Sequence, residues 1–148
     1  MEDLGNKQLL KIMWLPEAAS MIWDMKHESE ISLGAIQDET ANVYAEISSW
    51  AGRYEQFYKR WLEDETDVIY DIDHEINREI LSIVKGLNAT SNKYIFFYWF
   101  DVDRTNDDKF RWVTSPRSRE VLFDLGPDFH FLNRLISVED YMVFPKYE

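Results

Sequence analysis

One stretch of the chain has no polar position at all. Residues 94–100 read Tyr94-Ile-Phe-Phe-Tyr-Trp-Phe100, seven large apolar or aromatic side chains in a row. A β-strand with one face in water alternates apolar and polar residues, whereas a strand covered on both faces does not. The run therefore predicts a central strand that the remaining elements cover on both sides.

Three segments have the spacing of an amphipathic helix. Apolar side chains fall on one stripe and charged ones on the other in residues 50–62, and a similar apolar stripe runs through residues 73–85. A shorter pattern in residues 18–25 follows Pro16, which suits the first position of a helix. These periods predict three helices, of which the one at 50–62 is the clearest and includes Leu62 on its buried stripe.

Capping and turn residues set the expected ends of the helices. Asp71 or Asp73 is expected to cap the second helix, because a carboxylate accepts hydrogen bonds from the free amides of the first turn. Lys85-Gly86 is expected to end it, since glycine adopts the left-handed conformation at low cost. Asp128 is expected to cap a fourth, short helix that carries residues 131–136.

Alternating patterns predict further strands. Residues 31–35 and 43–48 alternate apolar and polar positions around a polar connection at 37–42, which predicts a hairpin. The stretch 9–15 fits either a strand or a helical turn. Shorter strands are expected at 68–70, 110–114 and 121–123, with a last edge strand at 141–144.

These elements predict an α+β fold. We expect residues 1–148 to form one domain with a mixed, mainly antiparallel sheet around strand 94–100 and three to four packed helices. A length of 148 residues suits one hydrophobic core. Hydrophobic residues make up 45% of the chain and aromatic residues 16%, which is ample for such a core.

Composition also bears on the compartment. The chain has no cysteine, so disulfides and thiolate metal sites are impossible. It shows no basic-then-apolar leader pattern and no apolar run near the roughly 18 residues of a membrane span. A cytoplasmic protein without membrane contact is the expectation.

The charge is unevenly distributed along a chain whose formal net charge is −12. Residues 63–79 hold eight carboxylates against Arg78 alone, a net charge of −7. Residues 104–119 hold five arginines and lysines against two aspartates, a net charge of +3. A dense carboxylate surface attracts basic partners and repels nucleic acid and anionic lipid.

Two Asp-x-Asp pairs each follow an apolar run. Asp71 and Asp73 follow Tyr70, and Asp101 and Asp103 follow Phe100. If the two runs were neighbouring strands, the four carboxylates could hold Mg²⁺ or Mn²⁺ for phosphodiester hydrolysis. Aspartates at such positions also serve as caps and turn residues, so both interpretations stay open.

Other catalytic signatures are missing from the sequence. His27, His74 and His130 occur without a Gly-x-Ser-x-Gly elbow, a histidine pair at metal-ligand spacing or a glycine-rich phosphate loop. The basic stretch Arg104–Arg119 could bind phosphate, with Trp112 as a stacking platform for a base. It could equally pair with the protein's own carboxylates.

The predicted order of strand, hairpin, helix, strand and helix resembles that of DnaQ-like 3′–5′ exonucleases, which have an RNase H-like arrangement. The resemblance covers residues 9–86 and rests on Ile31-Ser-Leu-Gly-Ala-Ile36, Val43-Tyr-Ala-Glu46 and Val68-Ile-Tyr-Asp71. It implies a metal-dependent nuclease whose first strand carries an Asp-x-Glu pair. Here that segment reads Ile12-Met-Trp-Leu-Pro-Glu17, and only Glu17 could replace part of the pair.

Three functional hypotheses follow. The first is a small, non-enzymatic acidic inhibitor of the immunity or anti-defence type, which needs no cofactor and binds a basic, nucleic-acid-handling protein but no nucleic acid itself. Its predicted contacts are Glu63, Asp64, Glu65, Asp67, Asp71, Asp73, Glu75, Trp61 and Tyr70. The alternative is a divalent-metal-dependent nuclease or phosphoesterase that uses Asp71, Asp73, Asp101 and Asp103. The third is a structural subunit that oligomerises through exposed aromatic side chains.

Overall fold

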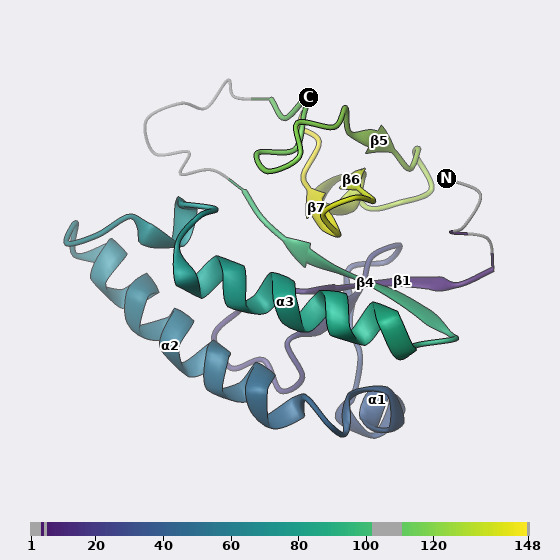
Figure 1. Ribbon diagram of the computed structural model, residues 1–148, viewed down its shortest axis with the longest axis horizontal. Helices are drawn as coiled ribbons and strands as arrows, with labels where there is room; N and C mark the ends of the chain where they lie inside the picture. The colour runs from purple at the N-terminus through teal and green to yellow at the C-terminus, as the bar shows by residue number, and fades with distance from the viewer. Residues whose placement is uncertain (1–3, 5, 102–110, 148) are drawn as a thin grey trace.

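The computed structural model describes residues 4, 6–101 and 111–147 (Figure 1). This part of the chain folds as mixed α+β, with a seven-stranded sheet and three α-helices. The strands are β1 (Gln8–Ile12), β2 (Ile22–Asp24), β3 (Ser29–Glu30), β4 (Tyr94–Trp99), β5 (Phe123–Asp124), β6 (Leu135–Ser137) and β7 (Met142–Phe144). The helices are α1 (Leu33–Thr40), α2 (Tyr44–Leu62) and α3 (Glu75–Thr90), with short 3₁₀ helices η2 (Val68–Tyr70) and η3 (Phe131–Asn133).

The sheet has the order β3-β2-β1-β4-β7-β6-β5, with β4 in the middle. Its central position agrees with its unbroken apolar sequence. β1, β4 and β7 run parallel, with Leu10 opposite Phe96 and Tyr98 opposite Met142. The other four pairings are antiparallel. The sheet is therefore mixed, as predicted, but its three innermost strands are the parallel ones.

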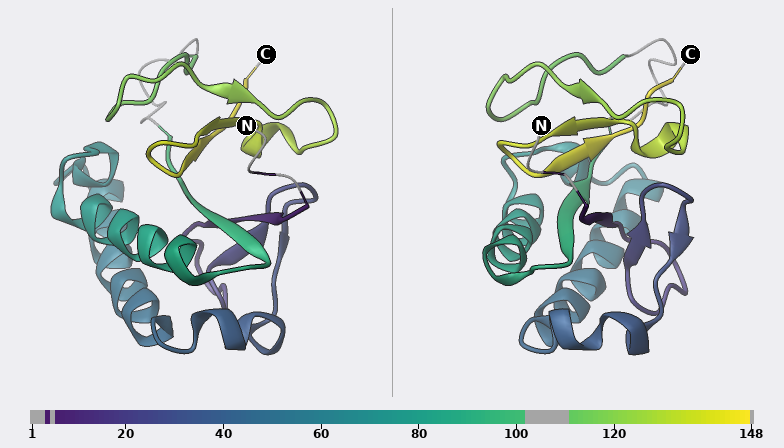
Figure 2. Two further views of the ribbon diagram at one scale, coloured as in Figure 1. Left: turned by 45° about the vertical axis from the view of Figure 1, so that its right-hand side comes forward. Right: turned by 90° about the vertical axis from the view of Figure 1, so that its right-hand side faces the viewer.

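Helices α2 and α3 cover one face of the sheet (Figures 1 and 2). Leu10 of β1 and Phe96 of β4 point into this layer and pack with Trp50 of α2 and Ile80 of α3, all fully buried. Trp50 also donates its indole N–H to the carbonyl of Ile76 at 2.8 Å, which joins the two helices. This layer is the main hydrophobic core.

The opposite face has a smaller core. Side chains that alternate with those of the helix face form it, and segments around β6 and η3 cover it rather than α-helices. Its buried apolar members are Leu9, Met25, Phe97, Ile136 and Val143. Lys11 of β1 lies on the same side as Leu9, because strand side chains alternate between faces.

The predicted hairpin at 31–49 is wrong, because these residues form α1 and the start of α2. The Ser32 side chain caps α1 by accepting a hydrogen bond from the Ala35 N–H. The buried positions in α2 are Ile47, Trp50 and Ala51, which follow the helical spacing i, i+3, i+4. This longer helical period overrides the short alternation.

The helix predicted at 18–25 is also absent. Residues 22–24 form β2 instead and pair antiparallel with β1, with Ile12 opposite Ile22. Met21, just before the strand, has a positive φ of 61°. A buried strand such as β1 needs hydrogen-bonding partners on both edges, and β2 supplies those on one side.

Three expectations around α3 need correction. The run at 68–70 is a 3₁₀ helix rather than a strand. His74, not an aspartate, caps α3, with its Nδ1 accepting from the Ile76 N–H at 3.1 Å. Gly86 does not end the helix, because the buried stripe continues to Leu87 and its burial outweighs a glycine cost of about 1 kcal/mol.

The C-terminal elements are shorter than expected and differently placed. The residue that caps η3 is His130, not Asp128, and residues 135–136 belong to β6 rather than to a helix. The predicted edge strand at 141–144 forms β7, which lies inside the sheet beside β4. In the predicted strand 110–114, Thr114 forms an isolated bridge to Val121, and Phe110 lies outside the described residues.

None of the described helices is long and apolar enough to cross a bilayer.

Candidate functional site

The acidic residues that the sequence singles out come together between α2 and α3. We call Glu63, Asp64, Glu65, Asp67, Asp71, Asp73 and Glu75 the acidic corner. They occupy the connection from the end of α2 through η2 to the first turn of α3, at the left of Figure 1, and all seven are exposed. Asp64 has a positive φ of 58°, which ends α2 and turns the chain.

Most of the corner's charge is not neutralised. Glu65 lies 3.6 Å from the Arg60 guanidinium, and Asp71 accepts a hydrogen bond from the Asp73 N–H at 3.0 Å. Apart from Glu65, the carboxylates of the corner form no ion pair with any residue that the structure describes: Glu63, Asp64, Asp67, Asp71, Asp73 and Glu75. Glu79, on the next turn of α3, differs because it pairs with Arg53.

The two predicted aromatic anchors are only partly available. Trp61 and Tyr70 are half-buried and pack edge to face with ring centroids 5.5 Å apart. Leu62, which the helical stripe placed in the core, is instead 59% exposed and directly precedes Glu63. Leu62 thus places an exposed apolar side chain directly beside the corner. It lies at the end of α2, beyond the part of the helix that packs on the core.

One buried side-chain amide holds the backbone of the corner near Asp71. Asn77 of α3 is fully buried and donates through Nδ2 to the carbonyls of Asp71 at 2.7 Å and Ile69 at 3.2 Å. Its Oδ1 accepts the hydroxyl hydrogen of Tyr98 in the central strand. These hydrogen bonds tie the part of the corner at Asp71 to the core.

The four aspartates of the metal hypothesis do not share the setting that motivated it. Asp71 and Asp73 follow a 3₁₀ helix, so they do not end a strand beside β4. Asp101 is buried and accepts from the Trp112 N–H at 3.1 Å and the Tyr147 hydroxyl at 2.7 Å. Asp103 lies outside the described residues, and within the described ranges no three His, Asp or Glu side chains could hold a metal ion together.

The elements behind the nuclease resemblance also differ. Residues 31–36 and 43–46 are largely helical, and β1 contains no carboxylate. Glu17 lies in the loop after β1, with a φ of 67°. The first strand therefore does not present the acidic pair that the resemblance implies.

The histidines and the basic stretch have structural surroundings. His74 and His130 cap helices, and His27 pairs with Asp24 at 2.8 Å. Trp112 packs against Phe144 with ring centroids 4.7 Å apart, so the core side of its ring is occupied. Arg104 and Lys109 lie outside the described residues.

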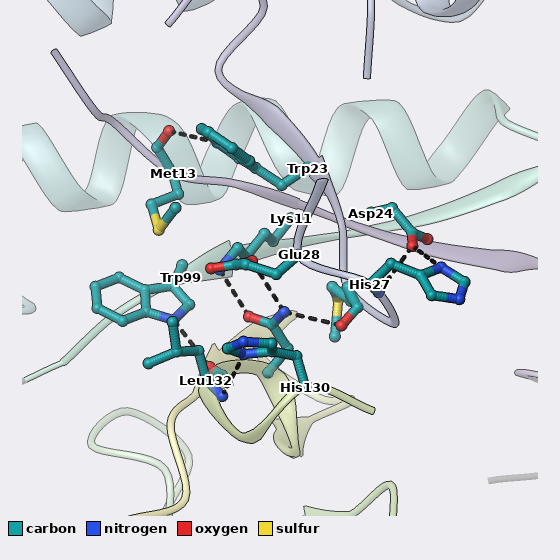
Figure 3. Close-up of polar contacts among 11 residues, drawn as sticks. Lys11, Met13, Trp23, Asp24, His27, Glu28, Trp99, His130 and Leu132 are labelled. Carbon is teal, nitrogen blue, oxygen red and sulfur yellow. Dashed lines mark hydrogen bonds and ion pairs between the residues drawn. The ribbon is translucent and has the colours of Figure 1, made fainter. Parts of the chain in front are cut away.

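A buried lysine cluster is the feature that the sequence reasoning missed (Figure 3). Lys11 is fully buried, and its Nζ lies 2.8 Å from a carboxylate oxygen of Glu28 and 2.7 Å from Oδ1 of Asn133. The ammonium also lies 5.3 Å from the centre of the Trp99 ring. Burial lowers the pKa of Lys11 to about 8, although the Glu28 carboxylate opposes this shift.

Asn133 connects this cluster to the rest of the smaller core. Its Nδ2 donates to the Met25 carbonyl at 2.8 Å and to Glu28 at 3.1 Å. The cluster thus joins β1, the β2–β3 turn and η3. Because Nζ has no exposed surface, the amine cannot meet a reactant in this conformation, and we assign it a structural role. The only sequence signal was a single lysine inside the apolar run Leu9–Met13.

Comparison with known proteins gave no relative. No protein-family model matches the chain, and no curated protein or solved structure matches it significantly.

Proposed function

We propose that this chain is an acidic binding protein whose acidic corner occupies the nucleic-acid-binding surface of a basic protein partner. The observation that carries the proposal is the set of exposed corner carboxylates that have no ion pair with a described residue, next to the exposed Leu62 at the end of α2. Protein interfaces commonly combine an apolar anchor with a polar rim, and Leu62 and the corner have that composition.

The charge of the corner supports fast and selective binding. Among the residues that the structure describes, six of the corner's seven carboxylates have no ion pair, which leaves a local negative field in a chain of net charge −12. Such a field accelerates encounter with a positively charged surface and disfavours acidic partners. A surface that binds DNA or RNA phosphates is positively charged, so it is the natural complement.

The hydrogen bonds that hold the corner at Asp71 support the same interpretation. The hydrogen bonds from Asn77 fix the backbone that presents Asp71 and, through Tyr98, tie it to the central strand. A preorganised surface loses less conformational entropy on binding than a mobile loop. An inhibitor of the immunity or anti-defence type that blocks a nuclease would use these properties.

The test compares two variants with equal charge. The corner variant replaces Glu63, Asp64, Glu65 and Asp67 with lysine. The matched control replaces four exposed carboxylates elsewhere with lysine: Glu17, Asp38, Glu46 and Asp128. Each changes the net charge by +8, from −12 to −4, so a difference between them reports position rather than total charge.

The assay measures association of each variant with a purified basic nuclease that binds the native chain at low salt. We expect the corner variant to associate at least about tenfold more slowly, and the control to change far less. The native chain should also displace DNA from the nuclease. Binding that survives corner reversal at low salt, or coexists with bound DNA, would contradict the proposal.

A further inference from the structure

A second charged surface, of opposite sign, lies along the outer side of α3. An open groove of about 760 Å³ runs between this helix and the turn at residues 115–118. Arg78, Ser82 and Lys85 line it along α3, and Arg117 lines it from the turn. Glu75 and Glu79 complete its polar lining, and the volume falls in the range of small-molecule sites.

The cations of the groove lack ion-pair partners in a protein rich in carboxylates. Neither Arg78, Lys85 nor Arg117 forms an ion pair with any described residue. Lys85 has no carboxylate one turn away on α3, where its neighbours are Leu81 and Ala89. Within residues 4, 6–101 and 111–147, no carboxylate lies at ion-pair distance from these three cations, although Asp140 interacts electrostatically with Arg117.

The carboxylates near the groove are mostly engaged already. Glu79 is neutralised by the Arg53 guanidinium, which donates to both of its oxygens. Asp140 accepts hydrogen bonds from the Ser115 hydroxyl and the Ser118 N–H. Burial raises the pKa of Asp140, but these hydrogen bonds and, to a smaller extent, the nearby Arg117 lower it overall. Only Glu75 remains as an unpaired negative charge among the lining residues.

We propose that the α3 groove binds a small molecule bearing a di- or triphosphate. Two guanidinium groups and an ammonium match the several negative charges of such a group better than the single charge of a carboxylate. The Ser82 hydroxyl adds a neutral donor. The groove is separate from the residues reversed in the corner variant, so this proposal does not depend on the proposed function.

The experiment uses inorganic pyrophosphate as the probe, titrated into the full chain at constant ionic strength. Backbone amide shifts in an NMR spectrum report where it binds. Variant R78A/K85A/R117A removes the groove cations, and K7A/K26A/K93A is the matched control, since its three lysines are exposed and lie away from the groove. Circular dichroism checks that both variants fold.

We expect saturable binding with shifts confined to α3 and residues 115–119. The groove variant should weaken binding at least about tenfold, because charge-assisted hydrogen bonds are lost, and the control should change it less than about twofold. Glu75→Gln should tighten binding by removing the unpaired carboxylate. Absence of saturation, shifts spread over other lysines, or equal losses in both triple variants would overturn the proposal.

Discussion

The two faces of the sheet are stabilised by different kinds of buried contact. The face under α2 and α3 is packed with apolar and aromatic side chains such as Trp50 and Phe96, and one buried amide, Asn77, serves the loop above it. The opposite face buries a lysine and an amide, with a half-buried carboxylate, among a smaller apolar set. Hydrophobic contact stabilises the first face. The second also depends on polar groups that must all be satisfied together.

This difference has a physical origin in the covering elements. A long helix supplies a continuous apolar stripe with its backbone already hydrogen-bonded, so it can cover strands without polar help. Short strands, turns and a 3₁₀ helix leave backbone carbonyls such as that of Met25 in need of donors. Asn133 supplies one, and its own oxygen then needs a donor, which Lys11 provides.

The largest expected effect is on the helix face. Trp50→Ala should lower the free energy of unfolding by about 3–5 kcal/mol, because it leaves a cavity and removes the hydrogen bond to Ile76. Urea unfolding followed by circular dichroism measures it. The control is Phe123→Ala on the edge strand β5, where the side chain is 44% exposed and the loss should be far smaller. Equal losses would show that the helix face is not the main core.

The next effect concerns the buried lysine. Lys11→Ala should cost about 2–4 kcal/mol, because it leaves Asn133 without a donor and Glu28 without its cation. The same unfolding assay measures the loss. The double variant Lys11→Met/Glu28→Gln should recover part of the loss, since it removes both charges and keeps apolar volume. If the double variant were less stable than Lys11→Ala, the unpaired charge would not be the cause.

A pH effect of about 1–2 kcal/mol should follow from the same residue. The pKa of Lys11 is near 8 when folded and 10.5 when unfolded, so the unfolded chain binds more protons between these values. The contribution of Lys11 to stability should therefore rise with pH from 8 to 10, by at most about 1.4 kcal/mol per pH unit.

The raised pKa values of Tyr54 and Tyr98 act in the opposite direction from about pH 9 upward, because unfolded tyrosines begin to ionise there. The net rise is therefore expected mainly below about pH 9.5. Unfolding curves measured at pH 8, 9 and 10 test the effect. Lys11→Met should remove the rise with pH. A variant that kept the rise would show that another group causes it.

The smallest expected effect on stability concerns the exposed side of α3, which faces away from the core. Gly86→Ala in α3 should raise stability by about 0.5–1 kcal/mol, since alanine favours a helix and an added Cβ meets no atom within 4 Å. Thermal unfolding measures it. A loss of stability would mean that the exposed side of α3 is more constrained than its packing suggests.

The parts of the fold that the sequence predicted are those with long, unambiguous patterns. The apolar run at 94–100 and the helical stripes of 50–62 and 73–85 appear as β4, α2 and α3. Patterns of five to eight residues gave wrong predictions of both kinds: the alternation at 31–35 and 43–48 lies mostly in helices, and the period at 18–25 lies around a strand. Over so few residues, tertiary pairing outweighs local preference.

The sequence located the acidic corner, because charge density along the chain is visible without a structure. It did not reveal that Leu62 is exposed at the corner, that Asn77 holds the corner, or that Arg117 lies across a groove from Lys85. Each of these facts depends on residues brought together from separate segments.

For this protein, the sequence by itself determined the α+β class, the middle position of β4 and two of the three described helices. It also determined the uneven distribution of charge along the chain. Each of these follows from the order of side chains within one segment. The tertiary structure alone decided that the inner strands are parallel, that β2 replaces a helix and that a lysine is buried. Those outcomes depend on which distant groups can satisfy one another's hydrogen bonds and charges, and no local pattern records that.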